Sequence, residues 1–410
     1  MPGQIYVARQ PIFDRNGQVY AYELLYRSSL ENYFSHHHDG DEASSSVINN
    51  SMFGFGLENL TGGKTAFINL TRTVLLKEWI TLIPKELVAA EVLETIEPDE
   101  AVIEACRKLK KSGYMVVLDD FVYDAKFEPL LALADIVKID FIVSSKEERA
   151  AMCQRFADKP FLLLAEKVEN HEEYQEALAL GFTYFQGYFF CKPEVVTRKD
   201  IPGFKLNYLR FLKELNRPDL DYANMEAIIK HDIALSYKLL RYINSVAFGW
   251  RRKVETIKQA LVMLGERPLK KWASLAAFSS IAEDKPPELL ITSLVRASFC
   301  ELIAADVGMK GKELDLFFIG MLSVVDALVD RPIEEILDEI GISDEVKEAL
   351  VDGGTPAANV LQLIVAYQQA DWEQVAEMVA LLEVDEARVP ELYYEAIAWA
   401  DEVGLPESIK

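Results

Sequence analysis

The sequence has few of the features that mark secreted, zinc-binding or membrane-spanning proteins. Its 410 residues contain four cysteines, Cys106, Cys153, Cys191 and Cys300, which are far apart and form no Cys-x-x-Cys pair. Neither a disulfide framework nor a zinc site is therefore expected. No run of 18 or more apolar residues occurs, and the amino terminus lacks the charged and then apolar pattern of a signal peptide. We expect a cytoplasmic protein with no membrane partner.

Basic residues are also scarce. The chain has 43 Lys and Arg against 66 Asp and Glu, which gives a net charge of −23 and a pI near 4.7. A surface that binds nucleic acid needs clusters of basic residues, so no DNA partner is expected. Much of the acidic excess falls after Met321, where it is typical of the solvated faces of surface helices.

Half of the residues are hydrophobic, and in the first half of the chain they form short runs that alternate with helical patterns. The runs predicted to be strands are residues 5–8, 19–25, 65–70, 87–94, 114–118, 134–141, 161–166 and 184–189. Alternating strands and helices are typical of a parallel sheet. The number of strands favours a closed α/β barrel of the TIM type, and the lack of a Gly-x-Gly-x-x-Gly motif weakens the dinucleotide-fold alternative.

Polar side chains stand at the ends of the predicted strands. Asp119 and Asp120 follow the apolar run 114–118, and a buried charge is costly unless it is paired or binds a metal. Taken alone, the pair could simply open a solvated loop. Further polar residues near other strand ends are Glu23, Asn69, Glu91, Lys138, Glu166 and Gln186. In a barrel these ends meet at one mouth, where the active site lies.

Five of these residues are carboxylates, and at one mouth they would repel one another strongly without a cation. Carboxylate oxygens with one amide suit hard ions such as Mg²⁺ or Mn²⁺. Lys138 could hold or polarise a water molecule or a phosphate oxygen. Two-metal hydrolysis of a phosphodiester requires these groups, because the metals generate hydroxide and stabilise the leaving oxygen.

The second half of the chain has no convincing strand pattern beyond a boundary near residues 192–203. Its helical patterns continue to residue 403. We therefore expect residues 1–200 to form the barrel domain and residues 201–410 to form an all-α domain.

Histidines offer two candidate metal sites, and neither is favoured. The run His36-His37-His38 stands in a polar stretch, where it is expected to be surface. His231-Asp232 invites comparison with metal-dependent HD phosphohydrolases, but such a site needs several histidines, and His231 is the only one after His171. We interpret His231-Asp232 as the start of a helix.

Eight short motifs follow one another along the first half. They are Gln10-Pro11-Ile12, Tyr22-Glu23-Leu24-Leu25-Tyr26-Arg27, Ile68-Asn69-Leu70-Thr71, Glu91-Val92-Leu93-Glu94, Asp119-Asp120-Phe121, Lys138-Ile139-Asp140, Ala165-Glu166-Lys167-Val168-Glu169 and Gln186-Gly187-Tyr188. In kind and order they resemble the EAL domain, a family that hydrolyses or binds cyclic di-GMP. The resemblance covers about residues 4–200, and eight motifs in order make it specific.

The resemblance implies a role for each of these positions. The metal ligands, for Mg²⁺ or Mn²⁺, would be Glu23, Asn69, Glu91, Asp119, Asp120 and Glu166. The catalytic residues would be Lys138, which orients the attacking water, together with Glu166 and Glu23. The residues that contact cyclic di-GMP would be Gln10, Leu25, Arg27 and Gln186. Glu169 would support the loop after Asp120.

Three positions depart from the family pattern. Leu24 replaces an alanine, Lys167 replaces a glycine, and Val122-Tyr123-Asp124 replaces a loop that contains glycine in the family. Glycines permit backbone turns that are closed to Val or Tyr, so this loop must follow another path. In the family the loop couples metal binding to dimerisation, so a homodimer is compatible with the resemblance although its supporting loop is altered.

The second half carries a resemblance of its own. Leu239-Leu240-Arg241-Tyr242-Ile243-Asn244-Ser245, Ile257–Gly265 and Phe318–Leu322 are similar to motifs of the HDOD domain, a non-catalytic relative of HD hydrolases. Ser323 stands where an HD enzyme would have histidine. The resemblance implies an interaction or regulatory module with an unidentified protein partner. We interpret Asn244-Ser245 as a cap that ends a helix.

Three functions remain open from the sequence. The altered loop favours a cyclic di-GMP signalling protein that binds the dinucleotide or a partner with weak or no hydrolysis. The complete ligand set favours an active metal-dependent phosphodiesterase that produces linear pGpG. The third alternative is a protein-interaction scaffold that does not need nucleotide.

Overall fold

The computed structural model describes residues 6–27, 56–191, 203–217, 219–245 and 253–404. The chain divides into two compact units, which are Met1–Lys192 with Gln362–Lys410, and Pro193–Leu361. This division differs from the single helical domain expected over residues 201–410, because the last helices pack with the barrel instead. The run His36-His37-His38 lies outside the described residues.

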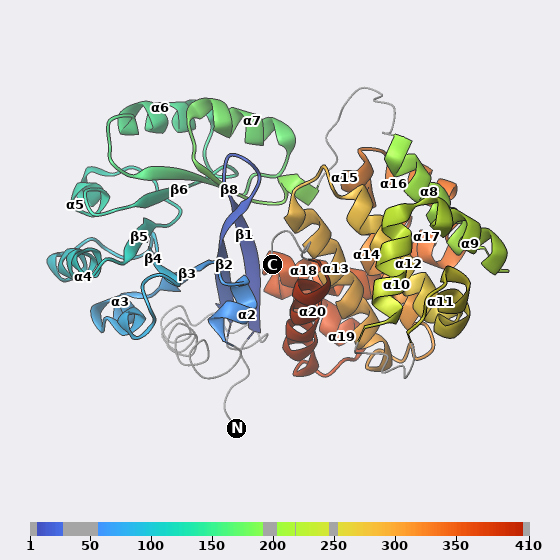
Figure 1. Cartoon of the computed structure of the whole chain (residues 1–410). Helices are drawn as coiled ribbons and strands as arrows, with labels where there is room; N and C mark the ends of the chain where they lie inside the picture. The colour runs from blue at the N-terminus through green and yellow to red at the C-terminus, as the bar shows by residue number, and fades with distance from the viewer. Residues whose placement is uncertain (1–5, 28–55, 192–202, 218, 246–252, 405–410) are drawn as a thin grey trace. The chain divides into compact units, whose positions relative to one another are not determined.

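Eight strands form a closed barrel and neighbour one another in sequence order (Figure 1). They are β1 (Tyr6–Phe13), β2 (Val19–Arg27), β3 (Thr65–Leu70), β4 (Val88–Val92), β5 (Met115–Leu118), β6 (Ile136–Asp140), β7 (Leu162–Glu166) and β8 (Tyr184–Gln186). The predicted α/β barrel is thus confirmed. One feature is additional, since β1 runs antiparallel to both β2 and β8.

A tight turn after β1 produces this reversal. The side chain of Asp14 accepts hydrogen bonds from the backbone N–H groups of Asn16 and Gln18, at 2.8 and 2.9 Å. Gly17 has a φ of 70°, a conformation that glycine adopts without strain. Antiparallel neighbours can be joined by so short a turn, whereas the parallel strands that follow need longer crossovers.

Helices lie on the outside of the barrel, in the crossovers between strands and, for the last of them, after β8 (Figure 1). They are α2 (Leu57–Thr61), α3 (Arg72–Leu76), η1 (Trp79–Leu82), α4 (Glu100–Lys111), η2 (Ala125–Phe127), α5 (Glu128–Leu131), α6 (Lys146–Phe156), α7 (His171–Leu180) and η3 (Phe189–Cys191). In α4, Asp99 caps the first turn by accepting the N–H of Val102 at 3.0 Å. Its buried face includes Val102, Cys106 and Leu109, which recur at helical spacing.

Only helices occur among the described residues of the rest of the chain. They are α8 (Gly203–Leu215), α9 (Tyr222–His231), α10 (Ile233–Ile243), α11 (Ile257–Leu264), α12 (Glu266–Ile281), α13 (Pro287–Leu302), η5 (Ile303–Ala305), α14 (Glu313–Leu322), α15 (Val325–Val329), α16 (Ile333–Ile340), α17 (Asp344–Val351), α18 (Pro356–Gln369), α19 (Trp372–Leu382) and α20 (Arg388–Gly404). The division between the two units falls within α18. Within the described ranges no single helix has the length and apolarity to cross a membrane, although α17 and α18, bent by 45°, pass that test as a pair.

Polar residues at helix ends hold the loops of the helical unit. Asp232 caps α10 by accepting the N–H of Leu235 at 3.0 Å, and Asn244 ends the same helix. The Asn244 side chain accepts the N–H of Val254 at 2.7 Å and donates to the carbonyl oxygens of Val254 and Leu240. The predicted roles of Asp232 at the start of a helix and of Asn244 at the end of one are therefore confirmed. His231, which was also expected at a helix start, is instead the last residue of α9.

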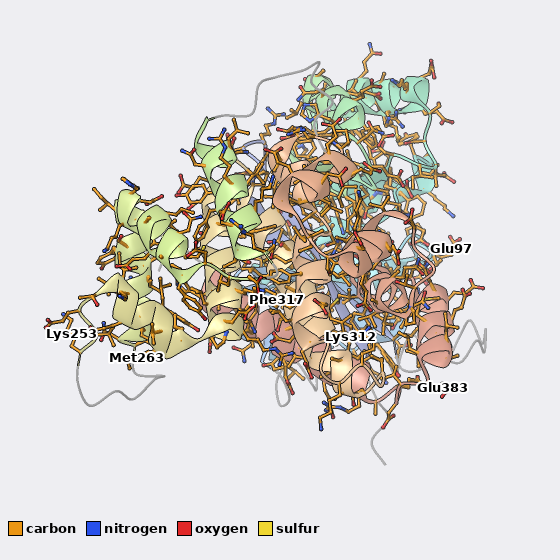
Figure 2. All side chains as sticks on the ribbon, turned by 90° about the vertical axis from the view of Figure 1, so that its right-hand side faces the viewer. Glu97, Lys253, Met263, Lys312, Phe317 and Glu383 are labelled. Carbon is orange, nitrogen blue, oxygen red and sulfur yellow. The ribbon has the colours of Figure 1, made fainter. Side chains whose placement is uncertain are left out.

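Helices α13 and α14 form the centre of this unit. Phe317 is fully buried within it, whereas Lys253 and Met263 lie at its outer end (Figure 2). At Gly320 the two helices approach so closely that an added Cβ would lie 2.3 Å from the carbonyl oxygen of Arg296. Gly320 is therefore required by packing, even though glycine is a poor helix former.

We predict that Gly320→Ala destabilises the protein by about 2 kcal/mol or more, because α13 and α14 must separate. Urea unfolding followed by circular dichroism measures the change. Gly353→Ala is the matched control, since its φ is +69° and nothing lies within 4 Å of the added Cβ. Its expected cost is about 1 kcal/mol. A Gly320→Ala protein as stable as this control would contradict the packing described.

Candidate functional site

The candidate site lies directly above an apolar layer of the barrel core. That layer consists of Ile12, Ala21, Phe67, Ala89, Val117, Ile136 and Leu164. Side chains alternate between the two faces of a strand, so the residue two positions nearer the mouth faces the same interior. Those residues are Gln10, Glu23, Asn69, Glu91, Asp119, Lys138 and Glu166. The strand period thus stacks a polar layer on an apolar one.

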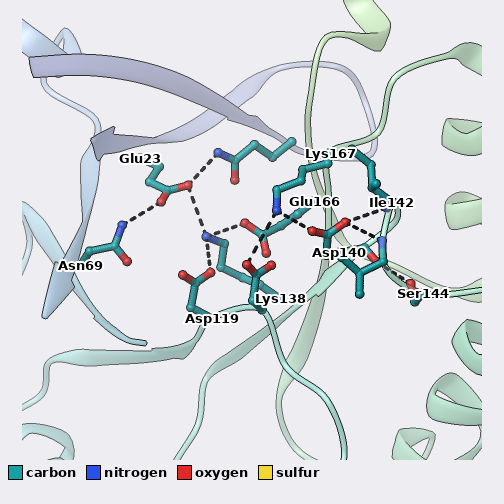
Figure 3. Close-up of polar contacts among 12 residues, drawn as sticks. Glu23, Asn69, Asp119, Lys138, Asp140, Ile142, Ser144, Glu166 and Lys167 are labelled. Carbon is teal, nitrogen blue, oxygen red and sulfur yellow. Dashed lines mark hydrogen bonds and ion pairs between the residues drawn. The ribbon is translucent and has the colours of Figure 1, made fainter. Parts of the chain in front are cut away.

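Lys138 lies at the centre of the polar layer, and its side chain is fully buried. Its Nζ is 3.2 Å from Glu23, 2.9 Å from Asp119 and 2.6 Å from Glu166 (Figure 3). It also contacts Glu91. One ammonium group therefore faces four carboxylates. A buried charge is tolerated only when it is paired, so Lys138 stabilises this cluster without neutralising it fully.

The unequal charges perturb the pKa values of the cluster. Burial, with repulsion from Glu23, raises the pKa of Glu91 well above its usual range, and burial also raises that of Glu166. Burial opposes the charge on Lys138 as well, but the carboxylates of Glu166 and Glu23 outweigh it and raise the lysine pKa. Contact with Lys138 likewise outweighs burial at Asp119 and lowers its pKa. A divalent cation bound here would favour the ionised forms of Glu91 and Glu166 that burial opposes.

Side-chain amides orient Glu23. Asn69 donates a hydrogen bond from Nδ2 to Glu23 Oε1 at 3.0 Å. Gln186 donates from Nε2 to Glu23 Oε2 at 2.7 Å and to Gln10 Oε1 at 3.0 Å. Both oxygens of Glu23 thus accept hydrogen bonds from side-chain amides, one on β3 and one on β8, and these bonds orient its carboxylate at the mouth of the barrel.

A second lysine, Lys167, lies beside Asp120 and Asp140. Lys167 Nζ is 2.5 Å from Asp140 Oδ2 (Figure 3). It is 3.7 Å from Asp120 Oδ2. Lys167 has a φ of 54°, which is strained for a residue with a side chain. The motif that this segment resembles has glycine here, and glycine adopts a left-handed backbone without strain. Lys167 places a positive charge next to Asp120.

Side chains support the loop after Asp120 in place of glycine turns. The Tyr123 hydroxyl donates to Glu128 Oε1 at 3.1 Å, and the Arg155 guanidinium lies 4.0 Å from the centre of the Tyr123 ring. Asp124 accepts the N–H of Lys126 at 3.0 Å. These contacts hold the loop in this protein, and the expected difference between its path and that of the family loop stays a prediction.

The donor set fits a divalent cation. Ligand oxygens of Asp119, Asp120 and Glu166 all lie within 4.8 Å of one another. Asp120 Oδ1 and Glu166 Oε2 are buried and have no hydrogen-bond partner among the described residues. Burying such oxygens unsatisfied is costly, and carboxylate oxygens are the ligands that Mg²⁺ and Mn²⁺ prefer. These three residues could hold the ion, with Glu23 and Asn69 nearby.

A cavity of about 720 Å³ opens over the polar layer. The predicted site residues that line it are Gln10, Glu23, Leu25, Asn69, Asp119, Asp120, Glu166, Glu169 and Gln186. Glu91 and Lys138 are fully buried below the cavity. Lys138 contacts Glu23 directly, and Glu91 is joined to Glu23 through Lys138. Arg27 ends β2 and is outside the described lining. The support of the Asp120 loop by Glu169 stays a prediction.

Sequence reasoning missed two contributors to this site. Asp140 is buried, accepts the N–H groups of Ile142 and Val143 and pairs with Lys167. Its alternation with Lys138 in the strand pattern could have indicated an inward side chain. The second contributor is the turn Gln369–Trp372, which lines the same cavity. No local sequence pattern predicts that this turn lines the cavity, because its position depends on how helices distant in the sequence pack.

Comparisons with known proteins agree with this geometry. The EAL domain family matches residues 63–193, and the HDOD domain family matches residues 201–330. The chain is 36% identical over 405 residues to the uncharacterized protein YuxH of Bacillus subtilis, covering 97% of this chain and 98% of that protein. It is 35% identical over 404 residues to the cyclic di-GMP phosphodiesterase CdgJ of Vibrio cholerae, covering 97% and 93%.

Among solved structures, the Bacillus subtilis YkuI protein, which has an EAL domain, is 19% identical with a TM-score of 0.38, covering 55% of this chain and 70% of that one. The closed barrel with its polar mouth and the helical unit define a two-part protein of the EAL and HDOD type. The two relatives that match over nearly their whole length establish the assignment. The chain belongs to the EAL domain family, with an HDOD domain after the EAL domain.

We predict that Lys138→Met destabilises the metal-free protein by about 3 kcal/mol or more, because four buried carboxylates lose their ammonium partner. Lys167→Met is the matched control. Its side chain is 49% exposed, so its expected cost is below about 1 kcal/mol. Thermal unfolding in a chelating buffer compares the two. Equal melting temperatures for the two variants would show that Lys138 does not hold the cluster together.

Proposed function

We propose that the mouth of the barrel binds cyclic di-GMP and hydrolyses one of its phosphodiester bonds to give linear pGpG. The observation that carries this proposal is the convergence of Asp119, Asp120 and Glu166 beside a cavity lined by Gln10 and Gln186. Asp120 and Glu166 each have a buried oxygen with no hydrogen-bond partner in the part of the chain that the structure describes. The phosphodiesterase CdgJ, which matches nearly the whole chain, supports the substrate class.

In this proposal Mg²⁺ or Mn²⁺ would be held by Glu23, Asn69, Glu91, Asp119, Asp120 and Glu166. Bound there, the metal would lower the pKa of water and offset charge on the phosphate. Lys138, kept protonated by its carboxylate neighbours, orients the attacking water. The water oxygen bonds to phosphorus, the bond from phosphorus to the 3′ oxygen breaks, and the 3′ oxygen takes a proton. Gln10, Leu25, Arg27 and Gln186 bind the dinucleotide.

A second candidate is a cyclic di-GMP receptor that hydrolyses slowly. Lys167 favours it, because an ammonium group 3.7 Å from Asp120 Oδ2 competes with a metal for the same carboxylate. The remodelled loop of Val122, Tyr123 and Asp124 points in the same direction, since the family loop couples the metal to dimerisation. In either case we propose that the HDOD domain binds a protein partner and that cyclic di-GMP is the signal.

We expect purified protein with Mg²⁺ or Mn²⁺ to convert cyclic di-GMP to linear pGpG. Glu23→Ala should lower the rate about 100-fold or more, because Glu23 joins Lys138 to the amides at the mouth. Chromatography of the products measures turnover, and calorimetry measures binding. Binding without turnover supports the slow receptor. Absence of both in folded protein would leave the nucleotide-independent scaffold.

Lys167→Gly should tighten Mn²⁺ binding several-fold, since it removes a competing cation and relieves a backbone with φ of 54°. Calorimetric titration with Mn²⁺ in the absence of nucleotide gives the affinity. Lys167→Arg keeps the charge and should bind Mn²⁺ as weakly as the natural protein. If the glycine and arginine variants bind Mn²⁺ equally, the charge of Lys167 does not control the metal site.

A further inference from the structure

One wall of the cavity comes from outside the barrel strands. Gln369, Ala370 and Trp372, at the junction of α18 and α19, line the same cavity as Glu23 and Asp120. The junction lies beyond residues 63–193 and 201–330, which match the two domain families. It nevertheless belongs to the compact unit that contains the barrel. The cavity is therefore completed by the carboxyl-terminal part of the chain.

Strand β1 holds this part of the chain in place. The N–H of Val7 donates to the Tyr367 hydroxyl at 3.2 Å, and the Tyr6 hydroxyl donates to Glu386. Tyr367 is fully buried. Away from β1, Asn59 donates from Nδ2 to the Tyr394 hydroxyl at 2.9 Å. Contacts at several points of the barrel thus position the junction.

The indole of Trp372 is fixed within this packing. Its ring lies edge to face with Tyr6, at 6.1 Å between centroids, and with Tyr367, at 5.3 Å. Ala370 has a φ of 56° and redirects the chain, and Asp371 begins α19 by accepting the N–H of Gln374 at 3.1 Å. The half-buried indole is held rigidly, and Trp372 is the only tryptophan on the described lining of the cavity.

A chain of hydrogen bonds joins the same junction to the polar layer. Gln10 donates from Nε2 to the carbonyl oxygen of Gln369 at 3.1 Å and accepts from Gln186 Nε2 at 3.0 Å. Gln186 in turn donates to Glu23, which contacts Lys138. The wall formed by the junction is therefore tied to the floor of the cavity through Gln10.

We propose that Trp372 is a base-binding residue, whose indole stacks against one guanine of cyclic di-GMP. This inference rests on the proposed function and assigns the part of the pocket that recognises a base. The carboxylate floor suits cations and phosphate, whereas a purine base stacks on a flat aromatic surface. Of the aromatic side chains that line the cavity, Tyr26, Tyr188 and Trp372, the indole of Trp372 is the largest ring, and it is packed against Tyr6 and Tyr367.

Isothermal calorimetry of cyclic di-GMP binding to the protein, in buffer that contains Ca²⁺, tests the proposal. Trp372→Ala should weaken binding about 10-fold or more, and Trp372→Phe should retain most of the affinity because it keeps an aromatic ring. Trp79→Ala is the control, since Trp79 is also half-buried but lies outside the lining, against Lys77. Natural affinity in Trp372→Ala would overturn the inference while leaving the proposed function intact.

Fluorescence gives a second readout that does not depend on truncation of the side chain. Stacking of guanine should quench tryptophan emission when cyclic di-GMP is added. The quench should persist in Trp79→Phe and be largely lost in Trp372→Phe. A full quench in Trp372→Phe would overturn the inference. Failure of the natural protein to bind cyclic di-GMP at all would instead overturn the proposed function, and the base-binding role with it.

Discussion

The buried ammonium group of Lys138 is the interaction on which the architecture of the site depends. It contacts carboxylates of β2, β4 and β7 and that of Asp119, which directly follows β5, and closure of the barrel brings them to one point. Without a positive charge these groups could not be buried together above an apolar layer. One ammonium does not balance them, however, and Asp120 adds a fifth carboxylate nearby. The fold therefore stabilises a cluster that has capacity for a divalent cation, and this links stability of the barrel to chemistry at its mouth.

The polar layer could be predicted from the sequence because it depends on local rules. Strand alternation puts Glu91 and Glu166 above Ala89 and Leu164, and parallel strands bring such positions to one mouth. The capping of α10 by Asp232 follows from similarly local chemistry. The grouping of residues 362–410 with the barrel could not be predicted. Several amphipathic helices follow one another here, and local sequence patterns do not specify which of them pack against the barrel. The antiparallel direction of β1 was implicit in the turn at Asp14 but is not a feature of the typical TIM barrel.

The departures from the family pattern have physical consequences that can be separated. At Lys167 the backbone is left-handed, a conformation that glycine also adopts, and the side chain adds a charge beside Asp120 and Asp140. In the loop after Asp120 the change concerns how the backbone is held. The side chain of Tyr123 fixes the loop through Glu128 and Arg155, where the family motif has flexible glycine. The carboxyl-terminal junction adds a third element, a wall connected through Gln10 to Glu23. Each acts on a different property, namely metal affinity, loop path and nucleotide contact.

The central claim is that the carboxylates at the mouth of the barrel hold a divalent cation. Anomalous diffraction from crystals grown with Mn²⁺ tests it most directly, because the signal locates the metal without any assumption about activity. The account predicts a Mn²⁺ peak bounded by Asp119, Asp120 and Glu166, which is absent from crystals of Asp120→Asn protein. Well-diffracting crystals with no peak at these residues, at Mn²⁺ concentrations that saturate ordinary carboxylate sites, would contradict it.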